Sequence, residues 1–363
     1  MTIILWRHMK LPFKKALVTG GAGFIGSHLI EALVSAKCKV TVVDNLSSGS
    51  LSNIEPFKDD ITFYQGDIRQ RDILDTAASG CDVIFHLAAM VSVPQTVELP
   101  VESAEINDIG TLNVFEAARS QNTRRIVFSS SCAVYGDDPV LPKTEGMIPK
   151  PTSPYAVQKL SAEHYARIYD ELYGLESVCL RYFNVFGPRQ DPSSTYSGVI
   201  SIFMTRAVQN ETPVIYGDGS QSRDFVFVKD VVNANLLAAA MNQPRGSIFN
   251  IGTGNQVSIN QLWELIATLG GQQKLRPHYE SARAGDIEHS YAAMDFTKKR
   301  LKFIPEFSLE QGLEMTFEWY RGQIADDRRQ RTDDRRQRTD DRRQRAEDRG
   351  QRTGDRGQRT EDR

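Results

Sequence analysis

Residues 16–26 read ALVTGGAGFIG, a short apolar run followed by a glycine-rich turn. Gly20, Gly23 and Gly26 have the spacing GxxGxxG, and Ala16–Thr19 before them is predicted to be a strand. In a strand–turn–helix unit, the first glycine allows the tight turn and the second lets a pyrophosphate approach the backbone. The third lets the helix pack closely on the sheet. The stretch therefore predicts the phosphate loop of a dinucleotide-binding sheet.

The residues that follow supply the context that this motif needs. Ser27–Ser35 is predicted to be an amphipathic helix, and Lys39–Asp44 a second strand that ends in an acidic residue. The N-terminus of the helix would face the phosphate charge, and Asp44 would accept both hydroxyls of the adenine ribose. Because a carboxylate repels a 2′-phosphate, the sequence favours NAD over NADP as the cofactor.

Short apolar runs alternate with helical patterns through the first half of the chain. This alternation predicts an α/β fold with a doubly wound parallel sheet of the Rossmann type, covered by helices on both faces. After about Phe186, loops rich in Pro, Gly and Ser predict a smaller C-terminal substrate-binding lobe. Further predicted strands are Ile61–Tyr64, Val83–Leu87, Arg125–Ser129 and Ser177–Tyr182, and further predicted helices are Asn107–Ser120 and Ala156–Tyr173.

These patterns divide the chain into four predicted parts. They are an N-terminal extension (1–12), an NAD-binding domain (13–185, with 224–250 returning to it), the lobe (186–223 and 251–325) and a tail (326–363). The tail repeats with period seven, beginning DDRRQRT at Asp326, and lacks the apolar positions that a coiled coil needs. It is predicted to be disordered or a fraying helix. It carries 14 Arg and 11 acidic residues, so arginine-driven binding of RNA or a partner is a minor alternative.

The composition of the whole chain is that of an ordinary globular protein. The 363 residues are 40% hydrophobic and 25% charged, with a net charge of -2, so the balance indicates neither nucleic acid nor a membrane surface as a partner. Its apolar runs are too short to span a bilayer. The four cysteines lack CxxC spacing and are predicted to be buried free thiols of a cytoplasmic protein. The six histidines show no ligand spacing, so no metal site is expected.

A second motif with chemical meaning is Tyr155-x-x-x-Lys159 in a predicted helix. Positions i and i+4 share one face, so the phenol and the ammonium can converge. A tyrosine that acts as a base near pH 7 needs its pKa lowered by about 3 units, which Lys159 and a cationic nicotinamide ring would both favour. The preceding strand ends in three serines, and ligands bind at such strand ends. The sequence therefore predicts Ser131, Tyr155 and Lys159 as catalytic residues.

Together these residues resemble the extended short-chain dehydrogenase/reductase family, within its nucleotide-sugar epimerases and dehydratases. The resemblance runs from about Lys14 to Tyr320. Its pieces, in the family's order, are TGGAGFIGSHL (Thr19–Leu29), GDI (Gly66–Ile68), HLAA (His86–Ala89), SSSCAVYG (Ser129–Gly136), SPYAVQK (Ser153–Lys159), RYFNVFGPRQDP (Arg181–Pro192) and RDFVFVKD (Arg223–Asp230).

The resemblance implies an NAD site beside a site for a UDP-sugar. At the cofactor, with the glycines, Asp44, Tyr155 and Lys159, it places Phe24, Ile25, Asn45, Asp67, Ile68, Leu87, Ala88, Ala89, Asn107 and Tyr182. At the substrate, with Ser131, it places Asn184, Val199, Tyr216, Arg223, Arg283, Asp286 and Ser290. Tyr216 would lie against the uracil, and Arg223 and Arg283 would bind the diphosphate, since guanidinium groups suit phosphate oxygens.

The residues after the active-site serine indicate the reaction. The resemblance implies that the family's dehydratases carry an Asp-Glu pair directly after this serine. Its decarboxylases of UDP-glucuronate carry a Glu at the same place. This chain has Cys132 and Ala133, which can do neither acid nor base work, so the resemblance favours a 4-epimerase. In that reaction Tyr155 takes the proton from the sugar 4-hydroxyl as hydride leaves C4 for NAD. The 4-keto sugar turns over, and hydride returns to its other face.

The sugar is indicated by one position in Gly285–Tyr291, a stretch that resembles the border of the family's sugar pocket. A Tyr at position 290 would close the pocket to a 2-N-acetyl group, whereas Ser290 leaves space. The sequence thus favours interconversion of UDP-GlcNAc and UDP-GalNAc, with UDP-Glc and UDP-Gal as further substrates. The alternative is that Ser290 is an ordinary strand residue.

Three other functions stay open from the sequence. One is a UDP-glucuronate-type epimerase, or another nucleotide-sugar epimerase or dehydratase, on the same scaffold. The others are a non-catalytic NAD-binding protein and a protein that binds RNA or a partner through its tail. The family resemblance also implies a homodimer, with the two long helices predicted above forming a four-helix interface.

Overall fold

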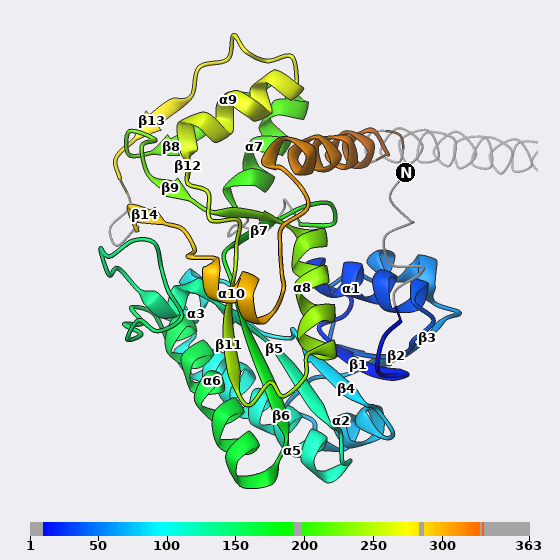
Figure 1. Ribbon diagram of the computed structural model, residues 1–363. Coiled ribbons are helices and arrows are strands. Elements are labelled where there is room, and N and C mark those ends of the chain that lie inside the picture. The colour runs from blue at the N-terminus through cyan, green and yellow to red at the C-terminus, as the bar shows by residue number, and fades with distance from the viewer. Residues whose placement is uncertain (1–9, 192–197, 283–286, 327–328, 330–363) are drawn as a thin grey trace, which may run out of the picture.

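A seven-stranded parallel sheet forms the centre of the computed structural model, which describes residues 10–191, 198–282, 287–326 and 329 (Figure 1). Its strand order is β11-β6-β5-β4-β1-β2-β3. The strands are β1 (Lys15–Thr19), β2 (Lys39–Asp44), β3 (Ile61–Gln65), β4 (Val83–His86), β5 (Arg125–Ser131), β6 (Glu176–Tyr182) and β11 (Ser247–Ile251). The chain leaves β1 towards β2 and later returns to β4 on its other side. Ligands bind at the carboxyl ends of the strands at such a reversal.

Helices cover both faces of this sheet, which confirms the predicted α/β doubly wound architecture. On one face, α1 (Phe24–Ser35) and α8 (Val228–Ala240) pack on alternate strand residues such as Val18 and Phe85. On the other, α2 (Arg71–Ala78), α5 (Thr111–Ser120) and α6 (Pro154–Tyr173) pack on the intervening residues, including Leu17. Successive side chains of a strand point to opposite faces. Because helices bury both faces, the strands are continuous apolar runs in the sequence.

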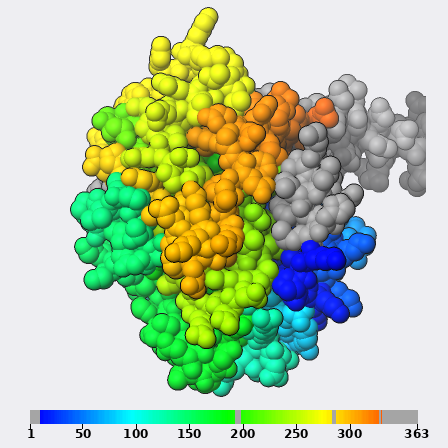
Figure 2. All heavy atoms as spheres, in the orientation of Figure 1, coloured from blue at the N-terminus to red at the C-terminus, as the bar shows by residue number. Residues whose placement is uncertain are grey.

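A smaller body lies beyond the carboxyl edge of the sheet and is built around its own core. It contains α7 (Val199–Gln209), α9 (Ile259–Leu269) and the helix over residues 309–326. In its core, the rings of Phe203 and Trp263 pack edge to face with their centres 5.4 Å apart. Its strands are short: β7 (Asn184–Phe186), β8 (Val214–Tyr216), β9 (Ser222–Arg223), β10 (Phe225–Phe227), β12 (Val257–Ser258), β13 (His278–Glu280) and β14 (His289–Ser290). In Figures 1 and 2 the segment around α10 (Asp295–Arg300), coloured orange, lies across the junction of this body with the sheet. The assignment of domain boundaries stays a prediction.

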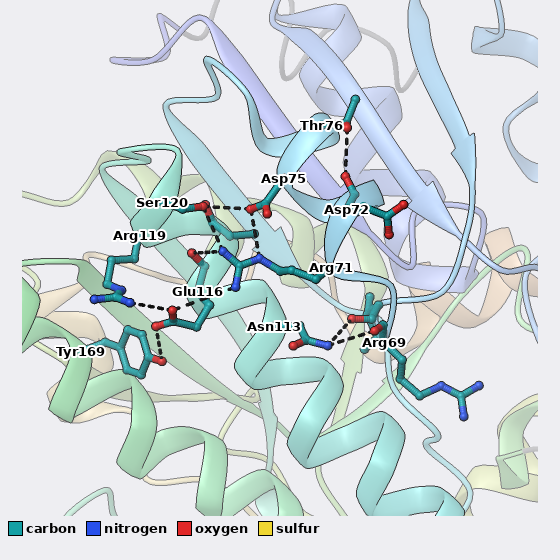
Figure 3. Close-up of polar contacts among 12 residues, drawn as sticks. Arg69, Arg71, Asp72, Asp75, Thr76, Asn113, Glu116, Arg119, Ser120 and Tyr169 are labelled. Atoms are coloured by element: carbon teal, nitrogen blue, oxygen red, sulfur yellow. Dashed lines mark hydrogen bonds and ion pairs between the residues drawn. The ribbon is translucent and has the colours of Figure 1, made fainter.

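A seam of polar contacts joins the helices on the second face (Figure 3). Arg71 on α2 donates to the Asp75 carboxylate at 3.0 Å and to the Glu116 carbonyl on α5 at 2.9 Å. Tyr169 on α6 donates to the Glu116 carboxylate at 2.8 Å. Such partly exposed pairs contribute little stability each, at most about 1 kcal/mol, but they fix how the three helices lie together. Asn113 of α5 donates to the Ile68 carbonyl at 3.2 Å, which holds the loop after β3.

Several predicted boundaries were wrong by a few residues. Helix α1 begins at Phe24 rather than Ser27, and strand β5 continues to Ser131 rather than ending at Ser129. The predicted helix from Asn107 begins instead as a π-helical turn over Glu105–Gly110. The short elements α3 (Val93–Glu98), α4 (Pro100–Ala104), η1 (Leu51–Asn53), η2 (Glu55–Phe57) and η4 (Cys132–Tyr135) were not predicted. Tertiary contacts, which local patterns do not encode, set these positions.

All four cysteines are free thiols, and three are buried, whereas Cys132 is partly exposed. Within the described ranges, no helix is long and apolar enough to cross a membrane. The same residues contain no group of His, Cys, Asp and Glu side chains that could hold a metal ion.

Two buried histidines predict a loss of stability in acid. His86 lies between the Thr19 and Thr111 hydroxyls at 2.8 and 2.9 Å, and His28 contacts the Pro188 carbonyl at 2.9 Å. Burial lowers the pKa of each to about 3. Below pH 6.5 the unfolded chain therefore binds protons that the folded chain does not. The stability that is complete above pH 6.5 is lost as the pH falls towards 3, by about 1.4 kcal/mol per pH unit for each histidine.

Urea unfolding of the wild type and of His86→Gln between pH 7 and pH 4 measures this loss. We expect the variant to have a slope of unfolding free energy against pH that is smaller by about 1.4 kcal/mol per unit. The exposed His278→Gln serves as the control and should keep the wild-type slope. Equal slopes in the wild type and His86→Gln would contradict the assignment of a neutral buried His86.

Candidate cofactor and substrate site

The glycine-rich turn between β1 and α1 is closed by tight backbone contacts. Gly20 has a φ of +72° and donates its N–H to the Val43 carbonyl at 2.8 Å. A Cβ at Gly20 would lie 2.7 Å from the backbone nitrogen of Ala88, and one at Gly26 would lie 2.2 Å from the Gly20 carbonyl oxygen. No other residue fits either place without moving the backbone. The turn therefore brings β1, β4 and α1 together.

The face of the turn at Gly23 is more open. A Cβ there would meet only the Gly20 carbonyl oxygen, at 3.2 Å. No side chain caps the N-terminus of α1, which has no acidic residue in its first turn, and Phe24 and Ile25 there are partly exposed. Uncapped N–H groups and the helix dipole attract a phosphate. These features fit the pyrophosphate of a dinucleotide.

Asp44 stands at the carboxyl end of β2, beside the turn. Its two carboxylate oxygens accept from the Ala22 and Leu46 N–H groups at 2.9 and 2.8 Å. Burial raises the pKa of Asp44, and these two hydrogen bonds oppose that rise. Each oxygen of a carboxylate can accept a further hydrogen bond. The predicted contact of Asp44 with the ribose hydroxyls is thus compatible with its surroundings.

Asn45, Asp67 and Ile68 form the next part of the predicted adenine site. Asn45 donates to the Asp67 carboxylate at 2.9 Å, and Arg69 donates to it twice, at 2.9 Å each. The Arg69 hydrogen bonds lower the pKa of Asp67 to about 2. Ile68 is buried, and a Cβ at Gly110 would come within 2.7 Å of its side chain. The ends of β2 and β3 are therefore joined by a carboxylate that is charged at neutral pH.

Leu87, Ala88 and Ala89 follow β4 and are partly exposed at the same edge of the sheet. Asn107, from the π-helical turn, holds this segment in place. Its side-chain oxygen accepts from the Met90 N–H at 2.8 Å, and its amide nitrogen donates to the Met90 carbonyl at 3.0 Å and to Gln158 at 2.7 Å. Both amide hydrogens of Asn107 are thus used inside the protein. The side chain supports the predicted cofactor-lining segment rather than offering these donors to a ligand.

The three predicted catalytic residues are brought together by β5 and α6. Ser131 is the last residue of β5, and Tyr155 and Lys159 lie one turn apart near the start of α6. A hydrogen bond joins Ser131 and Tyr155. The Lys159 ammonium donates to the Ser129 carbonyl at 2.8 Å and lies 5.6 Å from the centre of the Tyr155 ring. This geometry places a hydroxyl, a phenol and an ammonium at one strand end.

The pKa values of these groups correct one expectation. Burial raises the pKa of Tyr155 to about 12, against the opposing effect of the Ser131 hydrogen bond. Burial lowers the pKa of Lys159 to about 8. The expected lowering of the Tyr155 pKa by Lys159 does not occur in the protein by itself, because burial dominates and Lys159 is not among the groups that shift this pKa. Tyr155 is therefore a neutral phenol and Lys159 a cation at pH 7.

Tyr182, predicted to lie at the cofactor, has its hydroxyl in an internal network. The hydroxyl lies 3.0 Å from Ser129 Oγ and accepts from the Asn235 amide at 2.8 Å. Its side chain is buried among the residues between the sheet and α8. The network thus fastens the end of β6 to β5 and α8.

Residues predicted to bind the substrate come from separate elements of the smaller body. Ser290 of β14 pairs with Arg223 of β9, so the predicted sugar-pocket residue and the predicted diphosphate ligand are direct neighbours. Arg223 Nη1 donates to the Ser222 and Glu288 carbonyls at 2.9 and 3.2 Å. Its charge also reaches Cys132, because it opposes the rise in pKa that burial causes at that thiol. Arg223 therefore lies near the carboxyl end of β5.

Asn184 begins β7 and is partly exposed, and Val199 begins α7, where it packs against the core of the smaller body. Tyr216 ends β8, with its carbonyl accepting from Gln221 at 2.6 Å. Arg283 and Asp286 lie outside the described residues. Their predicted roles, like those of the other site residues, stay predictions.

A comparison with protein families identifies the chain. The model of the NAD dependent epimerase/dehydratase family matches residues 16–252. The chain belongs to this family. Membership makes it an enzyme of the epimerase/dehydratase type with NAD as its cofactor, as the glycine-rich turn and Asp44 predict, and confirms the resemblance seen in the sequence.

Individual relatives of this epimerase/dehydratase are close over nearly their whole length. This chain is 38% identical to the UDP-glucose 4-epimerase of Mycolicibacterium smegmatis, over 85% of this chain and 99% of that protein. The structure of the Thermotoga maritima UDP-glucose 4-epimerase with UDP-glucose matches with a TM-score of 0.81 and 40% identity, over 85% and 99% of the two chains. The UDP-N-acetylglucosamine 4-epimerase of Methanobrevibacter ruminantium, with UDP-N-acetylmuramic acid, matches with a TM-score of 0.82 and 41% identity, over 87% and 100%.

Sequence reasoning missed several polar residues behind the predicted catalytic groups of this epimerase/dehydratase. Glu163 and Gln158 lie on α6 and are buried, and Ser130 and Arg181 are buried on the neighbouring strands. One signal was available for Glu163, since it follows Tyr155 and Lys159 at the i+4 spacing that keeps all three on one helix face. The partners of the other residues are set only by the packing of β5, β6 and α6.

Proposed function

We propose that the enzyme catalyses NAD-dependent C4 epimerisation of a UDP-hexose, with UDP-GlcNAc and UDP-GalNAc as its main pair and UDP-Glc and UDP-Gal as a second pair. The observation that carries the proposal is the trio Ser131, Tyr155 and Lys159 beside Cys132 and Ala133. Neither of the last two side chains can expel water or assist decarboxylation as an acid or base. The trio can move one proton at one sugar oxygen, which is the acid–base step that epimerisation needs.

The roles of the trio follow from their positions and charges. When bound, NAD supplies the acceptor and donor of hydride. Tyr155 takes the proton of the 4-hydroxyl and returns it when the ketone is reduced on its other face. Ser131, hydrogen-bonded to Tyr155, donates to the same oxygen. Lys159, a cation at pH 7 next to the phenol ring, stabilises negative charge on Tyr155.

The choice of an N-acetylated sugar rests on Ser290. Its side chain is small, and its pairing with Arg223 supports a place next to the diphosphate and the sugar. A small residue there leaves volume for an acetamido group. The similarity to a UDP-N-acetylglucosamine 4-epimerase at 41% identity also favours this choice.

The proposal is tested by incubating the purified protein with UDP-GlcNAc and, separately, UDP-Glc, without added NAD, and quantifying each C4 epimer. Conversion of UDP-GlcNAc is the expected result, and activity without added NAD indicates retained cofactor. Conversion of UDP-Glc alone would overturn the choice of sugar. If neither reacts after NAD is supplied, epimerisation of these hexoses is refuted, and UDP-glucuronate is the next substrate to test.

We also propose that the enzyme is a homodimer through the outer surface of α6. Val157 on α6 is 52% exposed, and Ile109, Val97 and Val101 on the contacting elements η3, α3 and α4 are 53%, 58% and 73% exposed. Exposed apolar side chains on neighbouring elements favour a protein interface. A second copy of the chain is the partner that the family resemblance implies.

A charge in this surface is expected to separate the subunits. Val157→Glu should weaken the dimer at least about 100-fold, because the interface would bury an unpaired carboxylate. Size-exclusion chromatography with light scattering at micromolar concentration measures the mass. Ile304→Glu, at a position that is 62% exposed on another part of the chain, is the control and should keep the mass of the wild type. A dimeric Val157→Glu would refute this interface.

A further inference from the structure

The last three residues of β5 are serines, and each is held by different partners. The Ser129 carbonyl accepts from Lys159 at 2.8 Å, and its hydroxyl lies 3.0 Å from the Tyr182 hydroxyl. The Ser131 hydroxyl forms a hydrogen bond with Tyr155, and its oxygen accepts from the Ala133 N–H at 3.2 Å. The middle residue, Ser130, is buried. Its hydroxyl donates to the Glu163 carboxylate at 2.5 Å.

Glu163 connects this strand end to the catalytic helix. It follows Tyr155 and Lys159 on α6 at intervals of one turn, so the three side chains share one helix face. Arg181 of β6 donates to both oxygens of Glu163, at 2.8 and 2.7 Å. The side chains of this ion pair are each 2% exposed. With Ser130 as third donor, the carboxylate is fixed in position and orientation.

The connection continues from Arg181 towards the predicted sugar pocket. The Arg181 guanidinium lies 4.7 Å from the centre of the Tyr135 ring, and the Tyr135 hydroxyl donates to Asn250 at 2.6 Å. Asn250 in turn donates to the Lys143 carbonyl at 2.9 Å, and the Lys143 N–H donates to the carbonyl of Tyr291 at 2.9 Å. Tyr291 is the neighbour of Ser290, so one chain of polar contacts joins the catalytic strand to the strand that carries Ser290.

Stability alone gives no reason for a charged pair at this depth. Replacing a buried ion pair by apolar residues of similar volume is often neutral or stabilising. The faces of β5 and α6 already pack through Phe128, Ala162 and Ala166. Apolar contacts are non-directional, whereas a bidentate ion pair with a third donor allows one arrangement. The pair therefore adds geometric definition where β5 meets α6.

We propose that Ser130, Glu163 and Arg181 form a positioning device that fixes the end of β5 against α6, so that Ser131 and Tyr155 meet on one sugar oxygen with Lys159 beside Tyr155. The inference rests on the proposed function. None of the three positioning residues touches the substrate. They act through the catalytic trio, and a displacement of 1 Å at a reacting group can cost about 100-fold in rate.

Ser130→Ala is the decisive variant, because it removes the directional contact and leaves the Glu163–Arg181 pair intact. We expect kcat for the epimerised sugar to fall at least about 10-fold, with KM changed less than about 3-fold and the bound NAD content unchanged. Ser177→Ala is the matched control, since Ser177 is a buried serine on β6 whose hydroxyl donates only to the Leu175 carbonyl, at 3.1 Å. It should keep the wild-type kcat.

Glu163→Gln provides a readout that a purely structural role would not move. The Glu163 carboxylate is one of the groups that oppose the lowering of the Lys159 pKa by burial. NMR titration of 13C-labelled lysine side chains, with the Lys159→Met spectrum for assignment, should therefore give a lower Lys159 pKa in Glu163→Gln. The alkaline limb of kcat should move to lower pH by the same amount.

The outcomes separate this inference from the proposed function. Wild-type kcat in Ser130→Ala would overturn the positioning device, whether or not Glu163→Gln folds. A wild-type protein that converts none of the UDP-sugars would refute the proposed function instead. In that case an unchanged Lys159 pKa in a folded Glu163→Gln would overturn the positioning device. If Glu163→Gln does not fold, an unchanged Lys159 pKa in Ser130→Ala would overturn the positioning device instead.

Discussion

Tyr155→Phe is expected to lower kcat for UDP-GlcNAc at least about 1,000-fold, because general acid–base catalysis by one side chain contributes about 10² to 10⁴-fold. The substitution removes the only atom of Tyr155 that can exchange a proton and keeps the ring. Ser131 and Lys159 remain in place, but neither can replace the phenol. The Ser131 hydroxyl is a weaker acid, and Lys159 is engaged with the Ser129 carbonyl.

The size of this effect follows from the electrostatics of the site. Burial raises the pKa of Tyr155 to about 12 in the protein by itself. Forming a phenolate near pH 7 from that state would cost about 7 kcal/mol. The positive charge of Lys159 and of a bound nicotinamide ring must offset most of this cost during turnover. Removal of the hydroxyl leaves nothing for these charges to stabilise.

Quantification of both C4 epimers and of bound NAD measures the prediction. NAD should remain at the wild-type level in Tyr155→Phe, since the glycine-rich turn and Asp44 are untouched. Tyr173→Phe, at the exposed end of the same helix, should keep full activity. Activity within 10-fold of the wild type in Tyr155→Phe would exclude Tyr155 as the proton-transfer group.

Features of the site that depend on local sequence were predictable. The strand, turn and helix around Gly20, and the acidic end of β2 at Asp44, lie within one βαβ unit, where spacing determines geometry. Tyr155 and Lys159 share a helix face for the same reason. The boundaries of these elements were less accurate, since the ends of β5 and α1 depend on contacts with other parts of the chain.

Features that depend on long-range packing were not predictable. Nothing near Ser130 in the sequence indicates a partner in α6, and nothing near Arg223 indicates that it pairs with Ser290. The direction of the Tyr155 pKa also needed the structure, because the effect of burial is invisible in a motif. In each case the residue type can be read from the sequence, but its partners and its burial depend on how distant parts of the chain pack together.

Ser290→Tyr is expected to lower kcat/KM for UDP-GlcNAc at least about 100-fold while changing that for UDP-Glc less than about 3-fold, since a steric pocket discriminates by about 10 to 200-fold per small group. Ser290 is 7% exposed and pairs with Arg223 in the short parallel ladder of β14 and β9. A phenol ring there would fill the volume that an acetamido group needs. UDP-Glc carries only a hydroxyl at C2, where UDP-GlcNAc carries the acetamido group, and would still fit.

The neighbouring position gives the matched control for the pocket. His289 lies on the same strand but is more exposed than Ser290, and its ring contacts the Ser222 hydroxyl at 2.8 Å. His289→Tyr adds a similar ring next to, rather than in, the proposed pocket and should treat the two sugars alike. An equal loss for both sugars in Ser290→Tyr would indicate general damage to β14. No loss for UDP-GlcNAc would place the acetamido group elsewhere, and the choice of sugar would then need another residue to explain it.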